Sequence, residues 1–279
     1  MDADALRTKA EALRALHVPG QPLVLLNAWD AASAAVIARA GARAIATTSA
    51  GAANNLGYAD GQNLTLGQML ATVVPISRAV DLPVTADMEA GYGDTPEDAA
   101  ATTRGVLAAG AVGLNLEDTG DNGTEPLLSI ERFVAKIAAV KAVGAEAGVP
   151  VVLNARTDVF IGAVGDPATR LERAVERGRA YLAAGADCIF VPAVADPDVV
   201  AAVVEGIGGP VSILVGPGSP TIADLAALGV ARISVGSGAH RAALALTQRM
   251  ADEAYGAGTL DTMVAAQIPF AELQALFGA

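Results

Sequence analysis

The sequence predicts an α/β fold, a (β/α)8 barrel, and two observations support it. Eight short apolar runs alternate with segments of helical spacing along the whole chain, an order that implies parallel strands joined by right-handed crossovers. A proline precedes each odd-numbered run, and a glycine that would end a helix precedes each even-numbered run. In chain order these residues are Pro22, Gly41, Pro83, Gly110, Pro150, Gly185, Pro210 and Gly229. Such regular alternation favours a closed set of eight βα units.

Each strand is placed where apolar and β-branched residues gather. The expected strands are Leu23–Trp29, Ala44–Ser49, Val84–Glu89, Val112–Asp118, Val151–Asp158, Cys188–Val194, Val211–Gly216 and Arg232–Ser237. The clearest helices between them are Pro96–Ala109, Ile130–Ala147 and Pro167–Ala184. An open, doubly wound sheet is the alternative fold. That fold usually carries a G-x-G-x-x-G loop after its first strand, and here the position reads Asn27-Ala28-Trp29-Asp30.

No linker or shift in composition divides the chain, so we expect one domain over residues 1–279. Residues 1–17 form a charged amphipathic helix rather than an export signal, and His17 is expected on its surface. The helical tail from about 256 to 279 is expected to pack on a neighbouring subunit. Because no apolar run of about 18 residues occurs, the prediction is a cytoplasmic protein without a membrane partner.

The composition excludes several classes of protein. Hydrophobic residues make up 53% of the chain and aromatic residues only 4%, which indicates aliphatic strands under close-packed helices. The 30 acidic against 18 basic residues give a net charge of -12, which argues against a nucleic-acid partner because phosphate binding needs a basic surface. A single cysteine rules out an internal disulfide framework.

Acidic side chains gather at the carboxyl ends of the expected strands, where barrel enzymes place their active sites. Asp87 and Glu89 lie two residues apart on one strand and are expected to share a face, while Asp60 and Glu117 are expected to converge on them. So many carboxylates repel one another unless a cation neutralises them, and oxygen ligands suit Mg²⁺, with Mn²⁺ as an alternative. Arg156 adds a cationic fork for a carboxylate. The competing interpretation is that these acids cap helices and form surface ion pairs.

Neighbouring residues are assigned by their spacing. Asp118 has the opposite parity to Glu117, so only one of the two points into the barrel. Asp30 is expected to cap the first barrel helix, and Thr95-Pro96-Glu97-Asp98 reads as an ordinary helix start. Gly91 and Gly93 suggest a tight, mobile loop.

Three segments together resemble the isocitrate lyase/phosphoenolpyruvate mutase superfamily. They are Asp87-Met88-Glu89-Ala90-Gly91-Tyr92-Gly93, Gly113-Leu114-Asn115-Leu116-Glu117-Asp118 and Ala155-Arg156-Thr157-Asp158. The resemblance extends from Asn27 to about Gln248. It implies a Mg²⁺-dependent barrel that processes α-oxocarboxylates by making or breaking C–C or P–C bonds. It also implies a homo-oligomer, a dimer or tetramer, that exchanges a terminal helix.

The resemblance also implies roles for individual residues. Asp87 matches the acid that ligates the metal most directly and also meets the substrate, and Asp60, Glu89 and Glu117 match acids that hold the metal largely through water. The substrate-binding positions that match are Thr48, Ser49, Ala50, Asn122 and Arg156. Glu89 stands where many members have Asp. Arg156, Tyr92 and His240 are the catalytic candidates, with Tyr92, His240 or a metal-bound water as the proton donor. Trp29 is expected to pack rather than to react.

The chain departs from the superfamily in the loop after the fourth strand. Lyase members carry a Lys-Lys/Arg-Cys-Gly-His loop there, whereas this chain reads Asp118-Thr119-Gly120-Asp121-Asn122-Gly123-Thr124-Glu125-Pro126. Mutase and phosphonopyruvate hydrolase members have a longer loop with Lys. The lone Cys188 lies at the start of a strand, where we expect it to be buried and inert.

The sequence therefore predicts a Mg²⁺-dependent enzyme that cleaves a C–C bond of a small dicarboxylate, as a lyase or decarboxylase. The resemblance implies that the reaction passes through an enolate stabilised by the metal. Two alternatives stay open. One is an α-oxoacid-binding protein with little turnover, and the other is a phosphonomutase or a hydrolase of C–P or acyl bonds.

Overall fold

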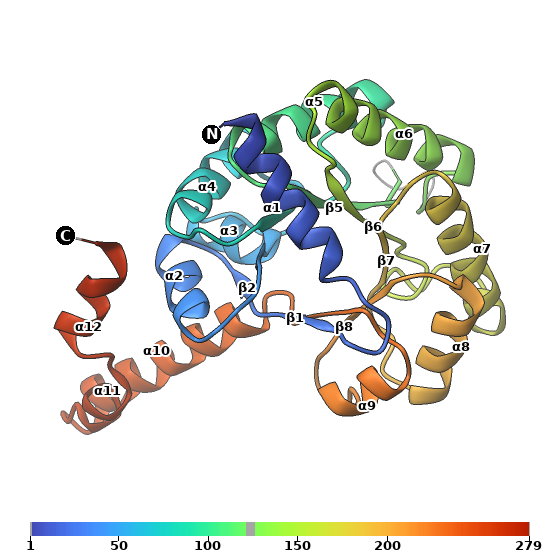
Figure 1. Ribbon diagram of the computed structural model, residues 1–279. Coiled ribbons are helices and arrows are strands. Elements are labelled where there is room, and N and C mark those ends of the chain that lie inside the picture. The colour runs from blue at the N-terminus through green and yellow to red at the C-terminus, as the bar shows by residue number, and fades with distance from the viewer. Residues whose placement is uncertain (1, 121–125, 279) are drawn as a thin grey trace.

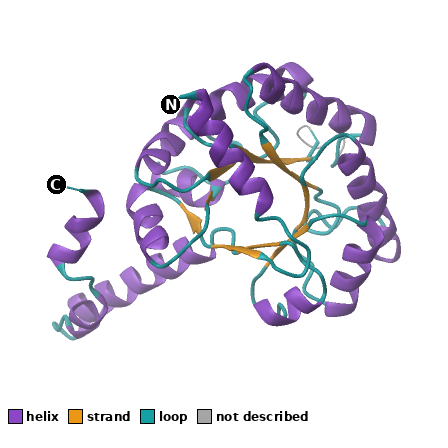
Figure 2. Cartoon of the chain, viewed as in Figure 1, coloured by secondary structure: helices purple, strands orange, loops and turns teal. Residues whose placement is uncertain are grey.

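The computed structural model describes residues 2–120 and 126–278, and its nine parallel strands form a nearly closed barrel surrounded by helices (Figures 1 and 2). The strands are β1 (Leu23–Leu25), β2 (Asn27–Ala28), β3 (Ile45–Thr47), β4 (Val84–Asp87), β5 (Gly113–Glu117), β6 (Val152–Arg156), β7 (Cys188–Val191), β8 (Val211–Leu214) and β9 (Arg232–Ser234). This architecture confirms the predicted (β/α)8 barrel.

The barrel closes through the first strand segment. β1 and β2 are the two halves of the one strand expected there, and they are separated at Leu26. β1 pairs with β9, with Leu23 opposite Arg232, whereas β2 pairs with β3, with Asn27 opposite Ala46. Each of the other expected strands was two or three residues too long, because residues at its ends leave the hydrogen-bonded sheet and enter the loops.

The helices lie outside the strands and alternate with them along the chain. They are α1 (Ala3–Ala15), α2 (Ala31–Arg39), α3 (Ser49–Asn55), α4 (Leu66–Arg78), α5 (Pro96–Ala108), α6 (Ile130–Glu146), η1 (Pro167–Thr169), α7 (Arg170–Ala183), α8 (Pro197–Ile207), α9 (Ile222–Ala227), α10 (Gly238–Gly256), α11 (Asp261–Ala266), α12 (Phe270–Gln274) and η2 (Ala275–Phe277). Two predicted helix starts are confirmed: Asp30 caps α2 and Thr95 caps α5, each in a reciprocal capping box.

The N-terminal helix α1 covers the end of the barrel where the strands begin (Figure 1). Arg14 of α1 donates to the carbonyl of Pro150 at 3.2 Å and to Asp187 at 2.8 Å, both just before strands. His17 follows α1 and is only 7% exposed, so the expectation of a surface histidine was wrong. The chain turns inward after α1, and the His17 ring contacts Arg232 inside the barrel at 3.5 Å.

The C-terminal segment projects from the barrel. Helix α10 leads away from it to α11 at the far end, and the chain then turns back (Figure 1). Glu272 of α12 lies 3.5 Å from Arg39 of α2, and η2 contacts α2. Large apolar side chains on this segment face solvent, among them Tyr255 at 91% and Phe270 at 78% exposure. Within the described part of the chain, no helix is long and apolar enough to cross a membrane.

Candidate active site

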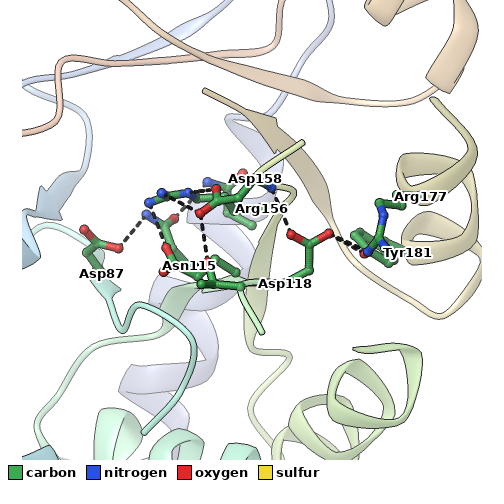
Figure 3. A network of polar contacts seen from close by, with 10 residues as sticks. Asp87, Asn115, Asp118, Arg156, Asp158, Arg177 and Tyr181 are labelled. Carbon is green, nitrogen blue, oxygen red and sulfur yellow. Dashed lines mark hydrogen bonds and ion pairs between the residues drawn. The ribbon is translucent and has the colours of Figure 1, made fainter. Parts of the chain in front are cut away.

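The acid at the end of β4 is the centre of the candidate site. The Asp87 carboxylate accepts a hydrogen bond from the Ser49 amide at 3.1 Å. It accepts another from the Asn115 side chain at 3.3 Å (Figure 3). The Asp87 amide donates to the Thr47 hydroxyl at 2.8 Å. Ser49 begins α3, with Thr48 as its N-cap, so the amide that meets Asp87 points out of a helix N-terminus. Two elements, α3 and β5, therefore hold this half-buried carboxylate, and β3 holds its backbone.

Glu89 lies beside Asp87 by a different route from the one expected. We expected the two acids to share a face of one strand, but β4 ends at Asp87 and Glu89 has a φ of 51°, outside the strand conformation. The turn buries its carboxylate to 5% exposure and brings it to the backbone amide of Gln62. Burial and the nearby charges of Asp87 and Asp60 raise the pKa of Glu89 to about 7. Asp60 itself lies in an exposed loop.

Arg156 at the end of β6 is held between Glu117 and Asp158, and Figure 3 shows its contact with Asp158. Its Nη1 lies 2.8 Å from Glu117, and its Nε and Nη2 lie 2.5 and 3.0 Å from the two carboxylate oxygens of Asp158. A guanidinium has five N–H donors, so these three contacts leave two N–H groups for a ligand. Burial raises the pKa of Glu117 above its ordinary value, although Arg156 opposes the shift.

Asp118 faces away from Glu117, as their parity predicts, and supports the site from outside the barrel. Its carboxylate is fully buried and accepts hydrogen bonds from the Asp158 amide at 2.9 Å, Arg177 at 2.9 Å and the Tyr181 hydroxyl at 2.6 Å. Arg177 and Tyr181 both come from α7, as Figure 3 shows. Asp118 thereby ties the backbone next to Arg156 to an outer helix.

A second polar chain lies inside the barrel. Asn115, which donates to Asp87, accepts from Asn154 at 2.8 Å and from Arg232 at 3.3 Å. Arg232 is 1% exposed, and no carboxylate among the described residues lies within 4.0 Å of it. Burial lowers the pKa of Arg232 to about 10, so the side chain still carries its charge at neutral pH. Cys188 at the start of β7 is fully buried, as predicted, and burial raises its pKa to about 12.

The structure brings most of the predicted site residues together. Tyr92 lies beside the acids, and burial and Glu89 raise its pKa above the ordinary range for a phenol. His240 instead packs against Trp29, with ring centroids 5.2 Å apart, and makes no hydrogen bond to the acids. Asn122 lies outside the described residues. In residues 2–120 and 126–278, no three acidic, histidine or cysteine side chains are placed to enclose a metal ion.

Three residues of the site were not predicted from the sequence, namely Asn115, Asp158 and Gln62. Asn115 and Asp158 belong to segments that we had singled out, yet their roles depend on cross-strand contacts with Asp87 and Arg156. The spacing offered one usable signal, because Arg156 and Asp158 are two residues apart and can face the same way. Gln62 offered none, since it meets Glu89 and Tyr92 from a separate loop.

A cavity of about 400 Å³ lies along the loop that follows β4, and its lining includes none of Asp60, Asp87, Glu89 and Glu117. Gln62, Tyr92 and Thr119 are among its lining residues. A second cavity of about 450 Å³ lies at the ends of β7, β8 and β9 and includes Arg241. Both open at the carboxyl end of the barrel, where a substrate of this fold would enter.

Fold and site together define a (β/α)8 barrel whose mouth combines clustered carboxylates with a fixed arginine. Residues 13–255 match the phosphoenolpyruvate phosphomutase family, and the chain belongs to that family, within the isocitrate lyase/phosphoenolpyruvate mutase superfamily. The chain is 31% identical to 2,3-dimethylmalate lyase of Eubacterium barkeri, over 96% of this chain and 94% of that protein. It is 34% identical to oxaloacetate decarboxylase of Rhodopseudomonas palustris BisB18, over 73% and 69% of the two chains.

A solved structure with the same architecture contains a metal. It is a phosphonopyruvate hydrolase in complex with oxalate and Mg²⁺, with a TM-score of 0.85 and 28% identity. The match covers 97% of this chain and 95% of that one.

Proposed function

We propose that this protein is a Mg²⁺-dependent enzyme that cleaves a C–C bond in a small dicarboxylate, as a lyase or decarboxylase. The observation that carries the proposal is the placement of Arg156 beside the acids, with two N–H groups free of the contacts to Glu117 and Asp158. A fixed guanidinium next to clustered carboxylates suits a ligand that is both an anion and a metal chelator. The relatives named as a dimethylmalate lyase and an oxaloacetate decarboxylase support the substrate class.

The donor set fits a hard divalent cation. Burial and the neighbouring acids raise the pKa of the Glu89 carboxyl to about 7. A bound cation would stabilise the negative charge of this carboxylate. Mg²⁺ keeps several of its waters, so it needs few direct carboxylate ligands. Asp87 would hold the metal directly, and Asp60, Glu89 and Glu117 through water. Mn²⁺ would suit the same oxygen ligands.

Bound Mg²⁺ would supply a Lewis acid for the keto oxygen of the substrate. Arg156 binds the substrate carboxylate with its two remaining N–H groups. The Ala50 amide, behind the Thr48 cap, lies at the N-terminus of α3, where it can donate to the same carboxylate. The Ser49 amide, which donates to Asp87, would exchange that partner for the substrate carboxylate. Asn122 is proposed to contact the substrate from the loop after β5.

Proton transfer is assigned to Tyr92 in this proposal. Its phenol lies beside Glu89 and holds a proton at neutral pH, and burial and Glu89 raise its pKa, which makes it a weaker acid than an ordinary phenol. Its position beside the acids, rather than its acidity, supports the assignment. His240 is the second candidate, although its ring packs on Trp29.

We also propose that the protein forms a homo-oligomer, a dimer or tetramer, through its C-terminal segment. Tyr255, Val264 and Phe270 are exposed apolar side chains on α10, α11 and α12 that a partner subunit would cover. As a separate proposal, we place the protein in the cytoplasm.

Turnover assays test the proposed reaction. Purified protein with Mg²⁺ is offered oxaloacetate, 2-methylisocitrate, 2,3-dimethylmalate and phosphonopyruvate, and loss of substrate and all products are followed by NMR, so that a keto acid, oxalate and phosphoenolpyruvate are told apart. We expect turnover of at least one of the C–C substrates, abolished in Asp87→Ala. Turnover of phosphonopyruvate alone would favour the phosphonomutase or hydrolase alternative. Tight oxoacid binding without any turnover would favour a binding protein.

A further inference from the structure

The loop after β4 has an unusual backbone. Glu89, Gly91, Tyr92 and Gly93 all have positive φ angles, of 51°, 91°, 58° and 154°. Glycine adopts such angles readily, but Glu and Tyr do so only where surrounding contacts enforce them. Those two strained residues are the ones whose side chains belong to the candidate site.

Two buried side chains hold this loop from behind. The Lys136 ammonium of α6 donates to the carbonyl of Ala90 at 2.6 Å and to that of Gly93 at 2.7 Å. The Thr102 hydroxyl of α5 donates to the carbonyl of Gly91 at 2.8 Å. Lys136 and Thr102 are 0% and 1% exposed, so water cannot replace either donor. We had expected the glycines to make this loop mobile, and these contacts argue against that expectation.

The loop is also held from the front. Gln62 accepts a hydrogen bond from the Tyr92 amide at 2.8 Å, and the Gln62 amide donates to the Glu89 carboxylate. At Gly91 a side chain would not fit, because a Cβ there would lie 2.6 Å from Leu116. The loop therefore fits between the barrel and the helices in one conformation.

Lys136 is a costly way to fill the space behind the loop. No carboxylate among the described residues lies within 4.0 Å of its ammonium, whose only hydrogen bonds are to the two loop carbonyls. Burial lowers its pKa. A methionine would fill similar volume without the cost of desolvating a charge. An apolar side chain would therefore pack here at lower cost, but only Lys136 makes the two hydrogen bonds to the loop that carries Glu89 and Tyr92.

We propose that Lys136 and Thr102 are positioning residues that hold the Glu89–Gly93 loop in the conformation that places Glu89 and Tyr92 in the site. The expected effect of these residues on ligand binding rests on the proposed function. Their expected effect on the conformation of the loop is independent of the proposed function. Lys136 supplies two of the three contacts and therefore has the larger effect.

Hydrogen exchange on the metal-free protein tests the restraint itself. The variants are Lys136→Met and Thr102→Val. Each has a matched control with a similar side chain on the same helix. Thr103→Val removes a buried hydroxyl that donates at 2.7 Å to Ala99 in its own helix. Lys141→Met removes an ammonium that bonds to Val151 and Asp187 at the other end of the barrel.

We expect exchange of the amides of residues 89–94 to accelerate at least tenfold in Lys136→Met and about threefold in Thr102→Val. Exchange in the barrel strands should not change, and neither control should affect the loop. Unchanged loop exchange in Lys136→Met would overturn the proposal, as would acceleration across the whole protein. If Lys136→Met does not fold, the pair Thr102→Val and Thr103→Val decides, and equal loop exchange in the two would overturn it.

Oxalate binding in the presence of Mn²⁺ adds a functional readout. We expect affinity about tenfold weaker in Lys136→Met and unchanged in Thr103→Val. Equal affinity in the parent and Lys136→Met would overturn the positioning role. Failure of the unaltered protein to bind oxalate would instead contradict the proposed function, while the exchange measurement would still test the restraint on the loop.

Discussion

Replacing Asp118 by Ala should destabilise the fold strongly, because this carboxylate is a fully buried hub. It forms an ion pair with Arg177 at 2.9 Å, and it also accepts from the Tyr181 hydroxyl at 2.6 Å and the Asp158 amide at 2.9 Å. Removing one partner of a buried pair costs about 3–5 kcal/mol, since the other charge remains buried without compensation. Typical domains have only about 5–15 kcal/mol of stability, so the loss is a large fraction of the total.

Urea denaturation followed by circular dichroism measures this loss. Arg7→Ala is the control, because the Arg7–Asp4 pair is exposed, with side chains 50% and 73% accessible, and exposed pairs contribute little. We expect a clear fall in the urea midpoint for Asp118→Ala and almost none for Arg7→Ala. A loss below about 1 kcal/mol for Asp118→Ala would refute the assignment of Asp118 as a hub, given the usual cost of breaking a buried pair.

Further predictions concern pH, the barrel interior and the C-terminal segment. Burial and Asp87 raise the pKa of Glu89 to about 7, so this carboxyl holds a proton below that pH. Because a proton competes with a metal ion, the Mn²⁺ dissociation constant should rise as pH falls from 8 to 6. A constant value in calorimetric titrations would contradict this. Arg232→Met removes a buried charge that has no carboxylate partner among the described residues. The melting temperature of this variant should therefore equal or exceed that of the parent. A marked fall in melting temperature would contradict the expectation. Truncation after Gly256 removes Val264 and Phe270 and should reduce the molar mass measured by light scattering to that of a smaller assembly; an unchanged assembly would contradict the role of the tail.

The barrel was predictable because its signals are local and repeated. Prolines before strands and glycines after helices recur along the chain, and Gly41, Gly110, Gly185 and Gly229 all have the positive φ that a helix-ending glycine supplies. The position of Asp87 and Arg156 at strand ends followed from the same pattern. That Asp118 and Glu117 face opposite ways followed from their parity alone.

Details that depend on distant contacts were not predictable from the sequence. Glu89 left the strand at a positive φ, and no property of its side chain indicates that turn. His17 was placed wrongly because its partner Arg232 lies 215 residues away in the chain. Lys136 lies within the expected helix Ile130–Ala147, and the sequence does not indicate that it is buried against a loop 43 to 46 residues earlier.

Calorimetric titration of oxalate into the protein, with and without Mg²⁺, tests the proposed site most directly. Oxalate is a dicarboxylate that both chelates a metal and meets an arginine, as the proposed substrates do. We predict binding that requires Mg²⁺ and that is lost in Asp87→Ala, while circular dichroism shows the variant to be folded. Oxalate binding that is independent of Mg²⁺, or that is equally tight in folded Asp87→Ala, would contradict the assignment of Asp87 and its neighbours as a metal-dependent oxoacid site.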